Sequence, residues 1–185
     1  MDIAISPTRP DTDTLVFAVA KGSIPALPVA ASATLVAGAA AARFTGEVAS
    51  SFESFVEEGG RTVRILLLGT GGGSDADLER AGGALAAKLL NSGAIHAAVE
   101  IVGGASGEGA ARLAFGALMR SWRIDTYRTR LPEKAKPTLS LVTIVSADAA
   151  PEWEKLAAVA AGVAFTRELV SEPANILYPE SFVER

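Results

Sequence analysis

Cysteine is absent from the sequence, and histidine occurs only once, at position 96. The lack of cysteine excludes disulfides, thiol catalysis and cysteine-based zinc sites. Any metal site would therefore have to be built mainly from carboxylates. A serine triad also needs a histidine base, and the one candidate, His96, lies at the start of a predicted strand. We expect this side chain to be packed or exposed rather than catalytic.

Long uniform runs are absent as well. No stretch reaches about 18 uninterrupted apolar residues, so we predict no membrane span and no membrane partner. The first residues lack a basic segment followed by a long apolar run, so we expect no secretory signal. Basic runs are missing too. The net charge of −4 and the pI of about 5.1 argue against a general nucleic-acid surface.

Apolar residues, by contrast, are plentiful. They make up 49% of the 185 residues, and the mean hydropathy is +0.31. This content is enough for a sizeable core and argues against disorder. The length indicates one domain, or one domain with an added segment.

Short apolar runs alternate with helical patterns along the chain. Strands are predicted at residues 13–20, 63–68, 95–102 and 139–145, with a further apolar run at residues 33–37. Helices are predicted at residues 38–50, 75–91, 108–121 and 151–170, and a turn at residues 57–60. Strands that alternate with helices imply an α/β sandwich whose sheet is mostly parallel.

The strongest candidate for ligand binding is a glycine-rich loop between a predicted strand and a predicted helix. It contains Gly69, Gly71, Gly72, Gly73 and Ser74. Backbone amides at such a junction can bind an anion. However, the spacing departs from the dinucleotide fingerprint, and no lysine is present for a P-loop. Acidic residues at positions 75, 77 and 79 would repel phosphate. A tight turn with a packing role and an anion site both stay open, and residues 103–109 offer similar glycines.

Two other patterns suggest chemistry less directly. Ser106 lies between glycines, but Glu108 occupies the place of the last glycine in a nucleophile elbow, so we predict no catalytic serine. Aromatic residues and arginines also interleave, at Trp122, Arg123, Tyr127, Arg128 and Arg130. Such a segment could stack on nucleic acid, but it is equally typical of a subunit contact, and we favour structure or interface.

The C-terminal third carries the most specific motifs of the sequence. In residues 161–180, a Gly-Val pair and an Arg-acid-Leu-Val step lead into Glu-Pro-x-Asn and a following Pro-Glu. In residues 116–127, a predicted helix end is followed by an aromatic-Arg-x-Asp-x-Tyr run. With these motifs the chain resembles the leucyl aminopeptidase family, the cytosolic metallo-aminopeptidases. Residues 64–69 and 80–83 are also similar to the family in order and spacing.

The resemblance implies a specific domain organisation. It implies an N-terminal α/β domain at residues 1–150, a three-layer sandwich with a mixed, mostly parallel sheet that is similar to macro domains. A linker helix would follow at residues 151–170, and residues 171–185 would begin a catalytic domain that continues past them. In the family that second domain holds two divalent metal ions, Mn or Zn, and its Asn-Thr-Asp-Ala-Glu-Gly-Arg motif is absent here. No metal ligand or catalytic residue is therefore assigned to this chain, and no cofactor is expected in it.

The resemblance also implies a function. The parent enzyme would be a cytoplasmic homo-hexamer that removes N-terminal residues from peptides, and this chain would contribute structure and assembly. One alternative is a stand-alone module for a nucleotide or an ADP-ribose-like ligand, bound by the loops at residues 69–74 and 103–109. Another is DNA binding through the arginines of residues 120–130, which would show steep salt dependence.

Overall fold

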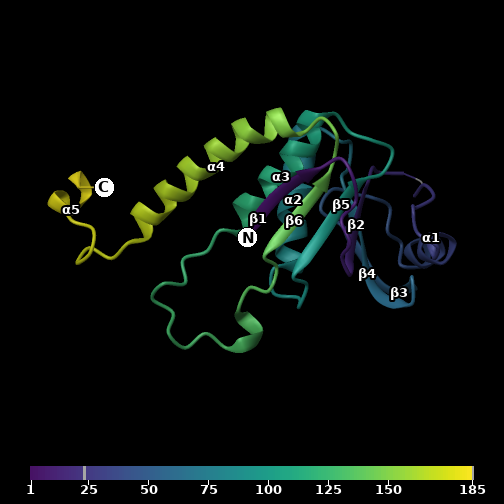
Figure 1. Ribbon diagram of the computed structural model, residues 1–185, viewed down its shortest axis with the longest axis horizontal. Helices are drawn as coiled ribbons and strands as arrows, with labels where there is room; N and C mark the ends of the chain where they lie inside the picture. The colour runs from purple at the N-terminus through teal and green to yellow at the C-terminus, as the bar shows by residue number, and fades with distance from the viewer. Residues whose placement is uncertain (23, 185) are drawn as a thin grey trace.

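The computed structural model describes residues 1–22 and 24–184 of the chain (Figure 1). Residues 23 and 185, the latter in the predicted start of a second domain, lie outside the described part. A six-stranded sheet runs in the order β1-β6-β5-β2-β4-β3. Its strands are β1 (Asp2–Ser6), β2 (Thr14–Val19), β3 (Ser51–Glu58), β4 (Arg61–Gly69), β5 (His96–Ile101) and β6 (Leu141–Val145). Neighbouring strands are parallel except β3 and β4, which are antiparallel.

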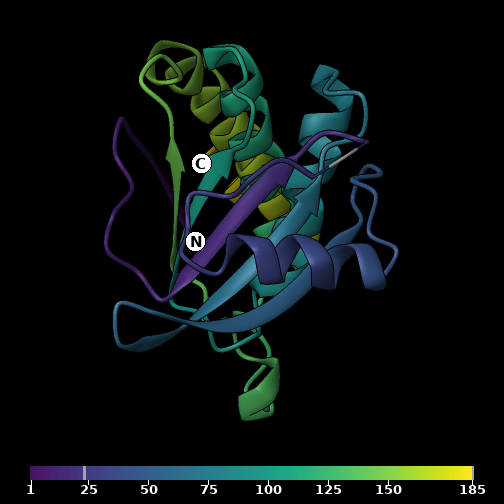
Figure 2. The ribbon, with the colours of Figure 1, turned by 90° about the vertical axis from the view of Figure 1, so that its right-hand side faces the viewer.

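Helices cover both faces of this sheet (Figures 1 and 2). They are α1 (Ser32–Ala41), α2 (Asp75–Leu89), α3 (Gly107–Ser121), α4 (Ala150–Ser171) and α5 (Pro179–Val183), with a 3-10 turn at Glu133–Ala135. One face packs against α2 and α3, and the other packs against α1. The predicted three-layer α/β architecture with a C-terminal helix is confirmed. Among the described residues, no helix is both long and apolar enough to cross a membrane.

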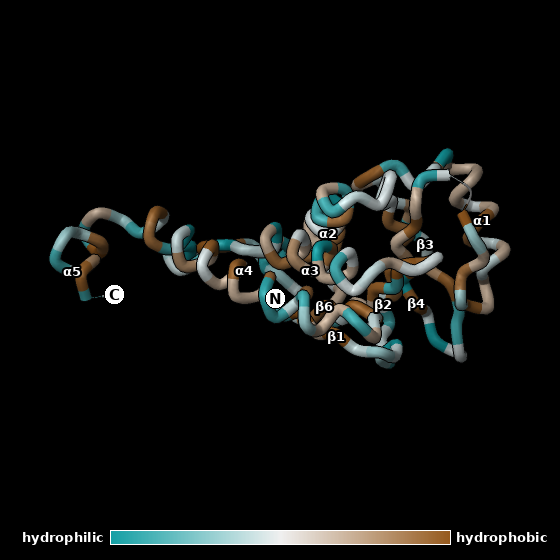
Figure 3. The backbone as a smooth tube through the Cα atoms, turned by 90° about the horizontal axis from the view of Figure 1, so that it is seen from above, coloured by the Kyte–Doolittle hydropathy of each residue, from teal (hydrophilic) through white to brown (hydrophobic). Residues whose placement is uncertain are grey.

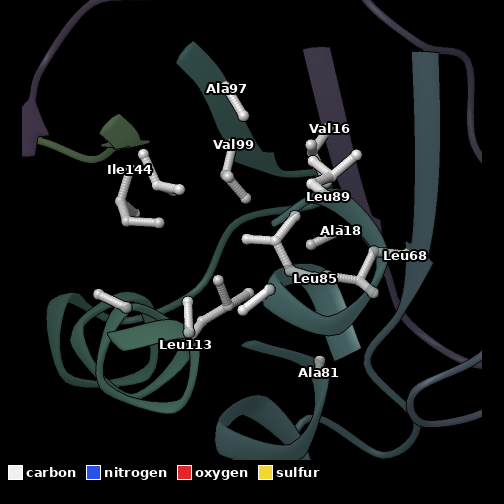
Figure 4. Close-up of a cluster of buried hydrophobic side chains, with 14 of the residues drawn as sticks. Val16, Ala18, Leu68, Ala81, Leu85, Leu89, Ala97, Val99, Leu113 and Ile144 are labelled. Carbon is white, nitrogen blue, oxygen red and sulfur yellow. The ribbon is translucent and has the colours of Figure 1, made fainter. Parts of the chain in front are cut away.

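The central strands are apolar throughout because helices or loops cover them on both sides. In β2, Val16 and Ala18 point into the cluster beneath α2 and α3, whereas Phe17 points into the cluster beneath α1. Figure 4 shows the first cluster, in which Leu85 of α2 and Leu113 of α3 meet the strand residues. Because these strands are covered on both faces, they are apolar along their length and could be predicted from the sequence. The predicted strands at residues 13–20, 63–68, 95–102 and 139–145 agree with β2, β4, β5 and β6.

One predicted helix is wrong over most of its length. The sequence places a helix at residues 38–50, but α1 runs from Ser32 to Ala41 and takes in the apolar run at residues 33–37. The chain then turns away to reach β3. Gly46 has a φ of +73°, and a Cβ there would lie 2.4 Å from the carbonyl oxygen of Ala20. The helix ends before this point, because Arg43, two residues past Ala41, has a φ of +56°. A left-handed residue does not continue a right-handed helix, and the close packing of Gly46 then fixes the path of the loop.

Two edge strands are missing from the sequence prediction. β1 and β3 lie at the two ends of the sheet, and each of their residues is only partly buried or exposed. In β1, Ile3 and Ile5 pack on the core beneath α3, while Asp2 is exposed. Edge strands of this kind have a weak apolar signal, because only one side of them meets another strand.

The last long helix has a different character from the others. α4 starts as predicted, with Pro151 in its first turn. Its first half packs on α3, and its second half extends beyond the sheet (Figures 1 and 3). All of α4 lies in the described part of the chain, and Ala160 is its only buried residue. The domain boundaries predicted around it stay a prediction.

The crossing of α2 and α3 is unusually close, because two glycines lie at the contact. A Cβ built on Gly82 would lie 2.0 Å from the carbonyl oxygen of Leu113, and one on Gly116 would lie 1.9 Å from the carbonyl oxygen of Glu79. No side chain fits at these distances. The two helix backbones therefore touch directly, and this contact sets the spacing of the layer above the sheet.

Replacement of Gly116 by alanine should push the two helices apart. We expect Gly116→Ala to lower the free energy of unfolding by about 3 kcal/mol, as overpacking of a tight contact does. The matched control is Gly83→Ala on α2, where the nearest atoms to a Cβ are 3.9 Å away. That change should raise stability by about 0.5–1 kcal/mol, because glycine is a poor helix former. Urea unfolding followed by circular dichroism measures the free energy of unfolding of both variants. Equal changes in the two variants would contradict the importance of the helix contact at Gly116.

Candidate functional site

The two glycine loops predicted from the sequence form the walls of a single cleft. It lies at the carboxyl ends of β4 and β5 and has a volume of about 270 Å³. Its lining includes Ala20, Thr70, Gly72, Gly73, Asp75, Gly104, Ala105 and Ser106. The carboxyl edge of a parallel sheet is where α/β proteins commonly bind ligands. The cleft is therefore the leading candidate for a ligand-binding site.

Several glycines of the first loop serve packing and turning of the chain. A Cβ on Gly69 would lie 2.0 Å from the carbonyl oxygen of Glu47, so only glycine fits at the end of β4. Gly71 and Gly73 have φ values of +60° and +76°, a region that favours glycine. The amide of Gly73 donates to the carbonyl oxygen of Thr70 at 3.1 Å. This part of the loop is a tight turn.

A carboxylate of the chain itself engages the rest of the loop. The amide of Gly72 donates to Oδ2 of Asp77 at 3.2 Å. Ser74 caps α2, because its Oγ accepts from the amide of Asp77 at 3.2 Å. An anion at Gly72 would have to displace the Asp77 carboxylate. The Gly72 amide, the loop donor that points at this carboxylate, is therefore already bonded to an internal anion.

An acidic cluster lies beside the cleft and reaches its rim through Asp75. Arg112 of α3 lies between Glu79, with Nη1 and Oε1 2.9 Å apart, Asp75 at 3.6 Å and Glu108 at 3.7 Å. The hydrogen bond to Glu79 is the main cause that raises the pKa of Arg112 above its usual value. Three carboxylates share one guanidinium, which leaves the cluster with a net negative charge. The pairs of Arg112 with Asp75 and Glu79 tie α2 to α3.

The two residues considered for serine chemistry lie apart in the fold. Ser106 caps α3, and its Oγ accepts from the amide of Gly109 at 3.1 Å. His96 stands at the amino end of β5, where its Nε2 is 2.9 Å from Oγ1 of Thr143. Ser106 follows the carboxyl end of the same strand. Both side chains have structural partners, and they do not form a catalytic pair.

The described residues offer no donor set that fits a metal centre. Among residues 1–22 and 24–184, no group of three histidine, cysteine, aspartate or glutamate side chains is placed to hold a metal ion. The carboxylates that do gather, Asp75, Glu79 and Glu108, are directed at Arg112. A positively charged side chain at their centre leaves no place for a cation.

The aromatic and arginine segment contacts the far half of α4. Nη1 of Arg167 donates to the carbonyl oxygen of Met119 at 2.8 Å, and its guanidinium lies 5.7 Å from the centroid of the Trp122 ring. The hydroxyl of Tyr127 donates to the carboxylate of Glu172. The two segments that carry the family resemblance, residues 116–127 and 161–180, therefore meet in space.

Some arginines of this segment have partners within it. Nε of Arg123 is 2.7 Å from Oδ2 of Asp125, and Nη1 of Arg128 is 3.7 Å from Oδ1 of the same carboxylate. Arg123 also donates to the carbonyl oxygen of Ala135 at 3.1 Å. These contacts agree with the structural interpretation of the segment, which sequence reasoning favoured over DNA binding.

A larger and more apolar groove lies between α4 and the body. Its volume is about 500 Å³. Its lining includes Met1, Leu90, Leu118, Met119, Trp122, Leu139, Ala157, Ala161, Ala164 and Glu168. Sequence reasoning missed this groove, because its walls come from segments far apart in the chain.

Large apolar residues are exposed on α4 and on the segment that follows it. In Figure 3 this part of the tube includes hydrophobic residues, drawn in brown. The exposed ones are Val159, Phe165, Val170, Ile176, Tyr178, Phe182 and Val183. Val170 is 79% exposed and Val183 is 85% exposed. A series of large apolar residues this exposed is typical of a surface that packs against another folded body.

Comparison with known proteins places these features in a family. The model of the cytosol aminopeptidase family, N-terminal domain, matches residues 18–131. A probable cytosol aminopeptidase of Caulobacter vibrioides is 36% identical over 162 residues, which cover 84% of this chain and 32% of that protein. One of Afipia carboxidovorans is 37% identical over 155 residues, 80% of this chain and 31% of that protein. The chain thus spans about a third of the length of these relatives.

Solved structures share the fold at lower identity. A mutant of tomato leucine aminopeptidase has a TM-score of 0.76 at 23% identity and covers 99% of this chain and 41% of its own. The bottromycin maturation enzyme BotP in complex with Mn has a TM-score of 0.73 at 19% identity and covers 95% of this chain and 35% of its own. Here too the likeness extends over well under half of the other chain.

Whether the glycine loop can hold an anion depends on Asp77. We expect Asp77→Ala to bind inorganic phosphate and ADP-ribose more tightly than the unmodified chain, because the change frees the Gly72 amide and removes a negative charge. Isothermal titration calorimetry measures this difference. The control is Asp75→Ala, which removes an equal charge from the rim but leaves the Gly72 amide bonded. Equal affinities for the Asp77→Ala variant and the unmodified chain would refute the anion-binding interpretation of this loop.

Proposed function

Because the chain belongs to the cytosol aminopeptidase family, as its N-terminal domain, we propose that it is the non-catalytic part of a metal-dependent aminopeptidase. Its role in that enzyme would be structure and assembly. This proposal agrees with a body whose polar side chains are paired with one another. It also agrees with the donor set, which offers no metal centre among the described residues.

A single observation carries the proposal, namely the apolar surface of α4 and its continuation. Phe165 and Val170 are exposed on the helix, and Phe182 and Val183 are exposed beyond it. Exposed apolar side chains cost free energy in water unless another surface covers them. The relatives have about two-thirds of their length outside the matched region. We propose that a domain equivalent to that remainder packs on this surface.

The chemistry would belong to that second domain. Relatives are named probable cytosol aminopeptidases, and BotP was solved in complex with Mn. We propose that the whole enzyme removes N-terminal residues from peptides with two divalent ions, Mn or Zn. Such ions lower the pKa of a bound water and polarise the peptide carbonyl. The side chains of this chain would hold the second domain in place and would not touch the reacting atoms.

Assembly and location follow the same proposal. The full-length enzyme would be a homo-hexamer in the cytoplasm, a location that the word cytosol in the names of the relatives supports. A second candidate function rests on the cleft between the two glycine loops. In that case the chain would bind a nucleotide or an ADP-ribose-like ligand by itself, and binding of ADP-ribose by the unmodified chain would support it.

If the second domain carries the metal ions and the catalytic residues, this chain alone should be inactive. We expect no hydrolysis of leucyl-p-nitroanilide above the rate in buffer, with either Mn²⁺ or Zn²⁺ added, because no metal-activated water can form without a metal centre. Absorbance of the released nitroaniline measures the rate. The Caulobacter vibrioides relative, assayed in parallel, is the positive control. Activity that copurifies with this chain and is abolished by a chelator would contradict the proposal.

The proposed docking surface can be tested in a chimaera. This chain would replace the matching first third of the Caulobacter vibrioides relative, and the chimaera should assemble and hydrolyse leucyl-p-nitroanilide. We expect Val170→Asp to lower activity by about tenfold or more, because the charge would have to be buried against the second domain. Ala158→Asp introduces the same charge at another exposed position of α4 and is the matched control.

Size-exclusion chromatography should show that Val170→Asp alters assembly and that Ala158→Asp does not. If both variants assembled and worked like the unmodified chimaera, the apolar surface would not be the docking surface.

A further inference from the structure

Helix α4 contains a glycine at a position where helix bending is least opposed. Gly162 lies at its middle, and a Cβ there would meet nothing within 4 Å, so packing does not require glycine. Glycine inside a helix costs about 0.5–1 kcal/mol relative to alanine. Four residues on, Oγ1 of Thr166 donates to the carbonyl oxygen of Gly162 at 2.9 Å. This kind of hydrogen bond is associated with bent helices.

Little apolar packing holds the part of α4 beyond this position. Ala160 is the last residue of the helix that is buried, within the described part of the chain. Past it, Ala161 and Ala164 line the groove of about 500 Å³ that separates α4 from the body. An apolar groove of this size favours closure by movement of the helix, because closure would remove apolar surface from water.

The contacts of the segment at residues 119–127 oppose such movement. Arg167, five residues past Gly162, donates to the carbonyl oxygen of Met119 and lies over the ring of Trp122. At the end of the helix, the carboxylate of Glu172 accepts from the hydroxyl of Tyr127. Both contacts lie on the far side of the flexible position, where they can fix the direction of the helix.

This segment is in turn attached to the body. Arg123 pairs with Asp125 and donates to the carbonyl oxygen of Ala135. The same carbonyl oxygen accepts from Nδ2 of Asn91, just after α2, at 2.6 Å. A continuous set of contacts thus leads from α2, through residues 119–135, to the far half of α4.

We propose that residues 119–127 form a brace that sets the angle of the far half of α4 about Gly162. The brace acts through Arg167 and Tyr127 and holds the groove open. The inference rests on contacts within this chain and does not depend on the proposed function. In this proposal, the brace and helix α4 together determine the direction in which the chain leaves the domain.

Spin labels can measure this angle directly, because the chain has no native cysteine. Cysteines would be introduced as Ala87→Cys on α2 and Ser171→Cys at the end of α4, both at exposed positions. Residue 171 lies about 13 Å of helix beyond Gly162, so a swing of about 30° would displace it by about 7 Å. Pulsed electron paramagnetic resonance on the whole chain resolves a change of this size.

We expect one narrow distance distribution in the unmodified background. Arg167→Met together with Tyr127→Phe should shift or broaden it by several ångströms, and Tyr127→Phe alone should give a smaller effect in the same direction. Arg130→Met makes the same chemical change as Arg167→Met on the exposed loop and should leave the distribution unchanged. Circular dichroism would show that each variant keeps its helix content.

Gly162→Ala provides the second variant. Added to the double variant, it should restore a narrower distribution, because alanine stiffens the helix at the position where it swings. An unchanged distribution in both brace variants would overturn the proposal. So would a broadened distribution that Gly162→Ala does not narrow, because the movement would then lie elsewhere.

Discussion

The contact between the backbones of α2 and α3 determines the arrangement of most of this molecule. Gly82 and Gly116 let the two helices approach until no side chain fits between them. Both helices begin directly after parallel strands, so their spacing also fixes the two loops that precede them. The cleft at the carboxyl edge of the sheet is the space left between those loops. The ion pairs of Arg112 of α3 with Asp75 and Glu79 of α2 then hold the N-terminal ends of the two helices together.

The same arrangement explains why the cleft has little capacity for chemistry of its own. Each helix begins at a serine cap, and acidic side chains stabilise both first turns through the helix dipole. One of those acidic side chains, Asp77, takes up the amide of Gly72, a donor that a ligand in the first loop would need. The part of the chain that leaves large apolar side chains in contact with water is α4. The function that we propose therefore lies at the end of the domain and not at the edge of its sheet.

Sequence reasoning succeeded where a segment is buried on both sides, as in β2 and β4. Such strands are apolar along their whole length, and the pattern needs no knowledge of neighbours. It failed at the edge strands β1 and β3, which are only partly buried, and at residues 42–50, where an alanine-rich segment leaves its helix. In that segment Gly46 packs against the carbonyl oxygen of Ala20, and a contact between such distant residues leaves no local signal.

The amino-acid sequence by itself determined the α/β class, the positions of the buried strands and the family. These depend on local composition and on short motifs, which are readable one segment at a time. Only the tertiary structure joined the two motifs of the family, with Arg167 over Trp122 and Tyr127 bonded to Glu172. It also showed that Asp77 occupies the glycine loop. Both findings concern which side chains are in contact. Such contacts depend on how the helices pack on the sheet and on one another, because that packing brings together residues that are far apart in the sequence.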